Sequence, residues 1–159
     1  MPIFGLTNGL IPIVAYNYGA RNRSRIKEAF LTCVVTAMSI MLVGTIVFHV
    51  ATEPLLYLFD ATPEIIEIGK PALRIVSLCF VFAGFGISGG SVFQALGNGV
   101  YSLIVSFTRQ ILFIIPAAYL LSLTGKLNLV WFSFPIAEIS SVFLTVFFLL
   151  RIFKKKLNF

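Results

Sequence analysis

The stretch of sequence that decides the fold runs from residue 29 to residue 52 and reads AFLTCVVTAMSIMLVGTIVFHVAT. These twenty-four residues lie between Glu28 and Glu53 and contain no Asp, Glu, Lys or Arg. As an α-helix they would reach ~36 Å, which is enough to cross a ~30 Å hydrocarbon layer with some tilt. The stretch therefore predicts a transmembrane helix.

The composition of the whole chain agrees with this prediction. Of the 159 residues, 58% are apolar and 11% are charged, and the mean hydropathy is +1.00. A water-soluble domain of this size is much less apolar, so the lipid bilayer is the expected solvent and partner. The net charge of +6 does not indicate a nucleic-acid partner, because the basic residues form short clusters beside apolar segments, as membrane topology requires.

Five apolar segments can be distinguished, at residues 2–18, 29–52, 71–94, 101–121 and 129–150. The first would be ~26 Å long as a helix, which is short for a full crossing, so it is predicted to be a partial span. The fold class expected is an all-α integral membrane protein, a polytopic helical bundle of about five spans.

Prolines and small residues predict how these spans pack. Pro71 is expected in the first turn of a span, whereas Pro116 and Pro135 lie inside spans and should kink or break them. The run GFGISGGS at residues 84–91 would give its helix a surface of small residues that another backbone can approach closely. A packed bundle is predicted.

The distribution of basic residues predicts the orientation. Lys and Arg gather in the loop at residues 21–27 and again in the tail at residues 151–156, with four apolar segments between them. Positively charged loops favour the cytoplasmic side, and an even number of crossings returns the chain to that side. We therefore expect a multi-pass protein of the plasma membrane with a cytoplasmic C-terminus and with residues 53–67 facing outward.

Several classes of chemistry lack their motifs in this sequence. There is no GxxxxGK[ST] phosphate loop, no HExxH and no Cys/His cluster, which argues against ATP-driven transport within the chain, a metal site or another cofactor. No catalytic set is visible, since the single histidine, His49, lies near the outer end of a span as an interfacial residue would. Cys33 and Cys79 are expected to act as small buried hydrophobes. The sequence does not predict an enzyme.

Two charged residues inside the spans are the first candidates for a functional site. An unpaired charge in hydrocarbon costs at least ~2.5–3.5 kcal/mol, so such residues need a partner or a purpose. Arg109 lies sixteen residues before Gly125 and Glu138 thirteen after it, at depths of ~24 and ~20 Å on adjacent helices, so they can reach each other. The pair is either a structural clamp or a proton or cation site at Glu138 that Arg109 tunes.

Uncharged polar residues extend the candidate site. Asn8, Asn17 and Gln94 lie in apolar segments, where they can hydrogen-bond a substrate or another helix. The chain also has 17 Phe and 5 Tyr. A minority of these rings is expected to line a cavity for flat lipophilic cations, while most face lipid.

Several strings of the sequence resemble one transporter family. The string IVAYNYGARN at residues 13–22 resembles the G-x-N-x-G-A signature that closes a helix in multidrug and toxin extrusion (MATE) transporters, particularly in the MepA-like branch. The strings LFDATPE at 58–64 and FQALGNG at 93–99 are similar to two of the family's loops. A third similarity is to the last helical hairpin of the family, and it is carried by Arg109, Gln110, Pro116, Trp131, Pro135 and Glu138.

The resemblance implies a fold of twelve spans in two six-helix lobes, of which residues 1–159 look like the C-terminal part. The chain would then be most of the second lobe, and its partner would be the missing N-terminal lobe. The function implied is a secondary-active antiporter that exports amphipathic or cationic drug-like compounds in exchange for H⁺ or Na⁺, with the ion gradient in place of a cofactor. No acidic residue lies between Pro71 and Gln94, which argues against a second-lobe sodium site of the kind some branches have.

Two other functions remain open. A flippase for lipid-linked precursors would share the architecture, but its cavity is usually more cationic, and here Arg109 is the single cation deep in a span. A small structural membrane subunit without transport is the second alternative. An incomplete first segment argues against it, because such a subunit should begin with a full span.

Overall fold

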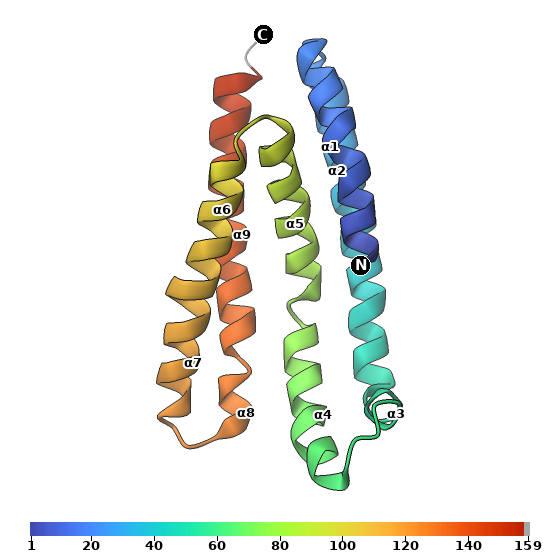
Figure 1. The fold of residues 1–159 in the computed structure, drawn as a ribbon, viewed down its shortest axis with the longest axis vertical. Coiled ribbons are helices and arrows are strands. Elements are labelled where there is room, and N and C mark those ends of the chain that lie inside the picture. Colours follow the sequence, from blue (N-terminus) through green and yellow to red (C-terminus); the bar gives the residue numbers. More distant parts are fainter. Residues whose placement is uncertain (158–159) are drawn as a thin grey trace.

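The computed structural model describes residues 1–157, which form a bundle of helices running up and down one long axis (Figure 1). The all-α fold predicted from the sequence is confirmed for these residues. The elements in chain order are α1 (Pro2–Gly19), α2 (Arg23–Val50), α3 (Thr52–Tyr57), α4 (Pro63–Ser77), α5 (Phe80–Ala95), α6 (Gly99–Phe107), the π-helix η1 (Thr108–Ile114), α7 (Ile115–Ser122), α8 (Leu127–Val130) and α9 (Ser133–Lys156).

Three helical stretches are long and apolar enough to cross a membrane: Arg23–Val50, Gly99–Ser122 and Leu127–Lys156. The helices α4 and α5 meet this criterion together as a pair bent by 49°, which raises the number to as many as four. The 18-residue helix α1 is not among them. The expected count of about five spans, the first of them partial, is therefore not confirmed.

The segment expected as one span over 71–94 has a different start and is interrupted. Its helix begins at Pro63, because Thr62 caps it by accepting a hydrogen bond from the Ile65 amide and proline suits the first helical position. Pro71 therefore lies inside α4, and its predicted place in a first turn is wrong. The helix breaks between Ser77 and Phe80, where the Thr45 hydroxyl donates to the Ser77 carbonyl at 2.9 Å.

The other two prolines distort their spans as predicted. Ahead of Pro116 the chain is π-helical over Thr108–Ile114, and the Ile115 amide donates to the Gln110 carbonyl, five residues back. Proline cannot donate to the carbonyl four residues before it, and a wider local helix is one response to that loss. Pro135 is the third residue of α9 and follows the break between α8 and α9.

The core lies where α1, α2, α5 and α9 meet. Its buried members include Val14, Ile26, Val92, Phe93 and Ile152. The small residues of α5 bring two helices close, as predicted. A Cβ on Gly84 would stand 3.3 Å from the Ala37 backbone of α2, and one on Gly89 would overlap Thr145 Cγ2 of α9. Cys33 and Cys79 are both buried and free, as expected.

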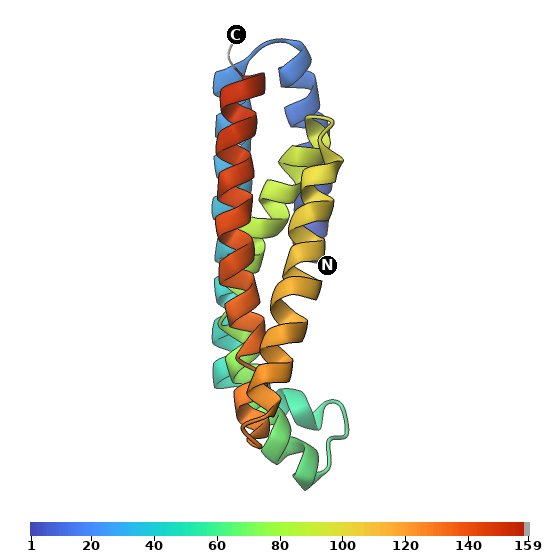
Figure 2. The same cartoon turned by 90° about the vertical axis from the view of Figure 1, so that its left-hand side faces the viewer.

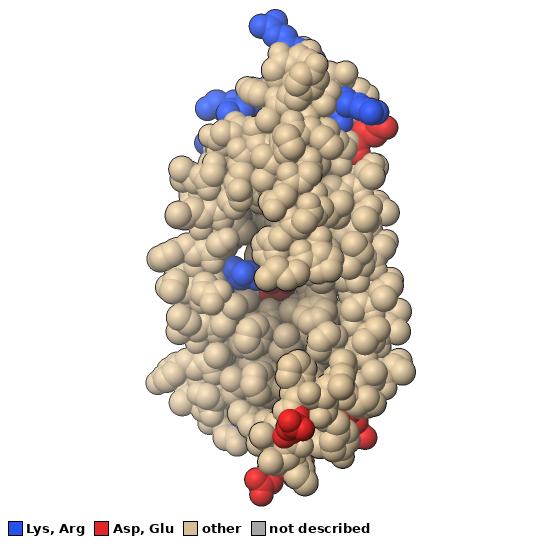
Figure 3. All heavy atoms as spheres, turned by 45° about the vertical axis from the view of Figure 1, so that its right-hand side comes forward, with Lys and Arg blue, Asp and Glu red and all other residues tan. Residues whose placement is uncertain are grey.

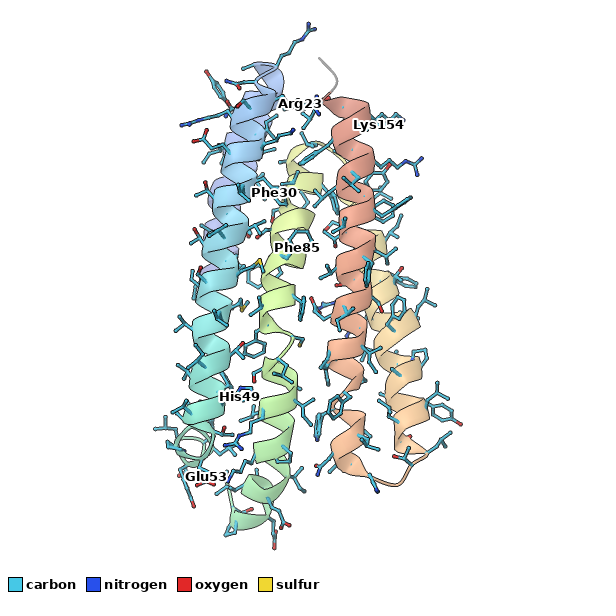
Figure 4. The ribbon with its side chains drawn as sticks, turned by 180° about the vertical axis from the view of Figure 1, so that it is seen from behind. Arg23, Phe30, His49, Glu53, Phe85 and Lys154 are labelled. Atoms are coloured by element: carbon cyan, nitrogen blue, oxygen red, sulfur yellow. The ribbon has the colours of Figure 1, made fainter. Side chains whose placement is uncertain are left out.

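The two ends of the bundle differ in charge. Arg23 and Lys154 lie at one end, while His49 and Glu53 lie at the other (Figure 4). The space-filling view has Lys and Arg gathered at one end beside one acidic group, and further acidic groups at the opposite end (Figure 3). The basic loop at residues 21–27 and the basic tail therefore share an end, which agrees with the even number of crossings predicted between them.

Candidate functional site

A cavity of about 460 Å³ opens midway along the bundle, between α1, α5, the α6–η1 segment and α9. Figure 2 shows α1, α5, α6 and α9 gathered around this level, and in Figure 3 a basic group and an acidic group lie at a hollow there. Polar side chains line it from every side. They are Thr7 and Asn8 of α1, Ser91 and Gln94 of α5, Ser102 and Ser106 of α6, Arg109 of η1, and Glu138, Ser141 and Thr145 of α9.

The charged pair predicted from the sequence is formed in this cavity. Arg109 Nη1 donates to Glu138 Oε2 at 2.9 Å. The side chain of Glu138 is 8% exposed and that of Arg109 is 37% exposed, so the carboxylate is buried and the guanidinium faces the open side. Because Arg109 lies in the π-helix, the proline-induced distortion sets the position from which it reaches α9. The pair joins two helices across the cavity.

Gly86 and Gly89 of α5 lie against the polar face of α9. A Cβ on Gly86 would lie 3.7 Å from Glu138 Oε1 and 4.0 Å from Ser141 Oγ, which is ordinary van der Waals contact. One turn further along, Gly89 permits the closest approach of α5 to α9. The small-residue run thus lies against α2 and also against the polar residues of α9.

Four of the five predicted site residues come together in this cavity: Asn8, Gln94, Arg109 and Glu138. Asn17 does not. Its Nδ2 donates to the Ile13 carbonyl at 2.8 Å, one turn back on its own helix, and it lies near the basic end of the bundle. The prediction of a role for Asn17 in the pathway therefore gains no support from its position.

Sequence reasoning missed several hydroxyl groups of the site. Ser141 and Thr145 follow Glu138 by three and seven residues, so they share its helical face, and that spacing could have identified them. Ser141 donates to the Glu138 carbonyl at 3.0 Å. The Thr145 hydroxyl is buried and has no hydrogen-bond partner among the described residues. Buried polar atoms are normally paired, so this hydroxyl is an exception beside the cavity.

Aromatic residues contribute less to the cavity than polar ones. Phe4 and Phe93 are the rings that line it. Others pack against each other, as in the stacked pair Tyr101 and Phe148 with centroids 4.6 Å apart. Many more are exposed on the outside of the bundle, among them Phe107, Phe143 and Phe147. This agrees with the expectation that a minority of rings lines the cavity.

A second polar cluster lies at the acidic end and supports the bend between α4 and α5. His49 Nδ1 is 3.0 Å from the Thr45 carbonyl and 3.2 Å from Ser77 Oγ. Arg74 donates to the His49 carbonyl at 3.3 Å and to the Thr52 hydroxyl at 3.4 Å. The contacts tie the C-terminal end of α2 to the broken span. In the part of the chain that is described, no group of three or more His, Cys, Asp or Glu side chains could hold a metal ion.

Apolar spans packed around an ion-paired polar cavity at mid-depth define a polytopic membrane protein of the transporter class. A family model described as MatE matches residues 1–120. The chain therefore belongs to the MatE family, and the resemblance seen in the sequence is confirmed. The members it matches are transporters and not enzymes.

Individual relatives agree with the family assignment. The multidrug export protein MepA of Staphylococcus haemolyticus (strain JCSC1435) is 30% identical over 146 residues, covering 91% of this chain and 32% of that protein. The chain thus spans about a third of the length of the curated relative it matches.

Solved structures agree on the fold. The outward-facing conformation of a multidrug resistance MATE family transporter of the MOP superfamily has a TM-score of 0.89 at 25% identity, covering 99% of this chain and 36% of that one. The inward-facing conformation of a multidrug resistance MATE family transporter of the MOP superfamily has a TM-score of 0.88 at 25% identity. That match covers 95% of this chain and 36% of that one.

Proposed function

We propose that this chain is most of the second lobe of a secondary-active multidrug efflux antiporter. In this proposal it works with the N-terminal lobe of the same transporter to export amphipathic or cationic compounds in exchange for H⁺ or Na⁺. The ion gradient is the energy source and no cofactor takes part. The protein lies in the plasma membrane with its C-terminus, and the basic end of the bundle, in the cytoplasm.

The observation that carries this proposal is the polar cavity with the Arg109–Glu138 pair at mid-depth. A cavity of about 460 Å³ is within the range that holds drug-sized molecules. It combines an ion-paired carboxylate, amide groups and two phenylalanine rings, a set that can hold an amphipathic organic compound through hydrogen bonds and ring faces. The site residues proposed for this pathway are Asn8, Gln94, Arg109 and Glu138.

The similarity to both an inward-facing and an outward-facing transporter supports a lobe that moves as one body. Its helices superpose with nearly equal scores on the two conformations, 0.88 and 0.89. A lobe with constant internal structure can rock against a second lobe and expose its cavity to each side in turn. This motion requires two lobes.

Within the cavity, we assign the Arg109–Glu138 pair the role of a clamp between η1 and α9. The 2.9 Å contact and the burial of the carboxylate fit a structural tie. The same pair balances one positive against one negative charge, which is unlike the strongly cationic cavity that a flippase for lipid-linked precursors would need.

The proposed function is tested by supplying the missing lobe. The chain alone, expressed in a pump-deficient bacterium, is expected to leave susceptibility to ethidium unchanged. Fused to the preceding part of MepA from Staphylococcus haemolyticus, it should restore ethidium efflux that stops when the ion gradients are collapsed. Export by the chain alone, or a folded fusion without export, would contradict the proposal.

A further inference from the structure

A second cavity lies on another side of α1, between α1 and α2, and has a different chemical character. Its volume is about 350 Å³. Four residues of α1 line one wall, Leu6, Gly9, Leu10 and Ile13, and five residues of α2 line the other, Arg25, Glu28, Ala29, Thr32 and Cys33. None of these residues lines the polar cavity. Its uncharged part extends over about two turns of α1, from Leu6 to Ile13, and about one turn of α2, from Ala29 to Cys33.

Gly9 keeps this groove open. A Cβ at Gly9 would have no atom within 4 Å, so the space beside it is empty. Glycine in a helix interior costs about 1 kcal/mol relative to alanine. Nothing in the packing of the described residues requires this glycine, since no neighbour approaches it. Because glycine has no side chain, the groove between α1 and α2 is open at this position, and a flexible apolar chain can lie in it.

One mouth of the groove is basic. Arg25 lies in the first turn of α2, and three more basic residues are within four positions of it in the sequence, Arg21, Arg23 and Lys27. Glu28 is the one carboxylate among residues 21–28. Arg25 Nη1 binds Glu28 Oε2 at 2.9 Å, and its side chain is 61% exposed. A guanidinium has five N–H donors, so this contact leaves others for an incoming anion. Figure 4 places Arg23, two residues away, at the basic end of the bundle.

We propose that this groove binds one anionic phospholipid, with an acyl chain along Leu6, Gly9 and Ile13 and the headgroup phosphate on Arg25. The charge at the mouth selects the anionic headgroup, because clusters of Lys and Arg at a membrane surface attract anionic lipids. The apolar walls fit the acyl chain. The groove has its charged residues at one mouth and its apolar residues further along α1, which is the arrangement of headgroup and acyl chain in a lipid of one leaflet. The inference does not depend on transport activity.

Native mass spectrometry of the full chain tests the proposal. The protein is loaded with phosphatidylglycerol or with phosphatidylcholine of identical acyl chains, and the bound lipid is counted after detergent removal. We expect one retained phosphatidylglycerol and little phosphatidylcholine. Arg25→Gln should reduce that preference about fivefold, the effect of one basic residue beside an anionic lipid. Glu28→Gln should increase it, because the competing carboxylate is removed.

Gly9→Leu places a side chain in the groove from a position where the added Cβ meets no atom within 4 Å, and it should abolish the retained lipid. Gly5→Leu is the matched control on the same helix, since a Cβ at Gly5 also meets open space and Gly5 does not line the groove. Both changes raise helix propensity, so neither should impair folding. Equal retention by the two variants, or equal retention of the two lipids by the unaltered protein, would overturn the proposal.

The MepA fusion distinguishes a lipid from a protein segment as the occupant. If a helix of the other part of the transporter covers the groove, the chain alone will retain lipid and the fusion will not. That result would overturn the assignment of the groove to a lipid. The proposal is supported if both the chain alone and the fusion retain the lipid and if Gly9→Leu removes it from both.

Discussion

Helix α5 meets α2 on one side and α9 on the other, and both contacts rest on small residues. On the α2 side, Gly84 lies against the Ala37 backbone, and the neighbouring core residues are apolar. On the α9 side, Gly86 and Gly89 face Glu138, Ser141 and Thr145. The comparison shows that close packing of two helices on small residues is not enough to form a polar site. The apolar contact stabilises the lobe, whereas the polar contact leaves a cavity with an ion pair.

The largest effect is expected from removing one member of that ion pair. Arg109→Gln strands the buried Glu138 carboxylate and should cost about 3–5 kcal/mol, which is seen as lost folded yield in detergent. Glu138→Gln should cost less, because the Arg109 side chain is 37% exposed and can be hydrated. The double variant should recover part of the yield of Arg109→Gln.

The yield is measured by size-exclusion chromatography of the fusion with the MepA part, beside thermal unfolding. Additive losses in the double variant would show that the two residues do not act as a pair. If Glu138→Gln folds normally and abolishes ion-driven export, the clamp is wrong and Glu138 is a coupling site.

A smaller effect is expected from Gly89→Ala. The added methyl group would overlap Thr145 Cγ2, and overpacking of this kind costs about 1–3 kcal/mol. Gly86→Ala is the matched control on the same contact, since its Cβ would meet Glu138 Oε1 at 3.7 Å without overlap. Thermal unfolding should separate the two variants. Equal stability would mean that α5 and α9 can separate without cost.

The smallest effect is expected at the acidic end, where Lys70 pairs with Glu53 on the surface. The hydrogen bond from Lys70, and then its charge, hold the pKa of Glu53 below its ordinary value. A lowered carboxylate pKa favours folding at neutral pH, and this contribution is lost as the pH falls below ~4.3. Exposed pairs contribute little, so Lys70→Gln should leave folding intact.

The measurement for this pair is the titration of Glu53 by NMR of carbon-labelled glutamate side chains. In Lys70→Gln the pKa of Glu53 should rise toward its ordinary value. A titration that does not change between the two proteins would mean that Lys70 does not contact Glu53 in solution.

The sequence predicted the features that follow from chemistry within one segment or from simple counting. Hydropathy identified the helical membrane fold, and the distances of Arg109 and Glu138 from Gly125 predicted their contact, which the structure confirms at 2.9 Å. Both succeed because a hairpin of two helices fixes relative depth. The distortion near Pro116 was predictable for the same local reason.

Features that depend on packing between distant segments were not predictable. The bend at Ser77 to Phe80 rests on Thr45 and His49 of α2, which are far away in the sequence. Asn8 and Asn17 look alike in the sequence, yet one lines the cavity and the other bonds to its own helix. The spacing of nine residues puts Asn8 and Asn17 on opposite faces of α1, but which face points inward is decided by packing against α2 and α5.

That difference between Asn8 and Asn17 gives the most direct test that the cavity binds the exported compound. In the MepA fusion with its cysteines replaced by alanine, Asn8→Cys and Asn17→Cys are alkylated separately by a maleimide, with and without ethidium. Ethidium should slow the reaction at position 8 and leave the reaction at position 17 unchanged. Equal rates with and without ethidium at position 8, or equal protection at both positions, would contradict the assignment of the cavity to the transport pathway.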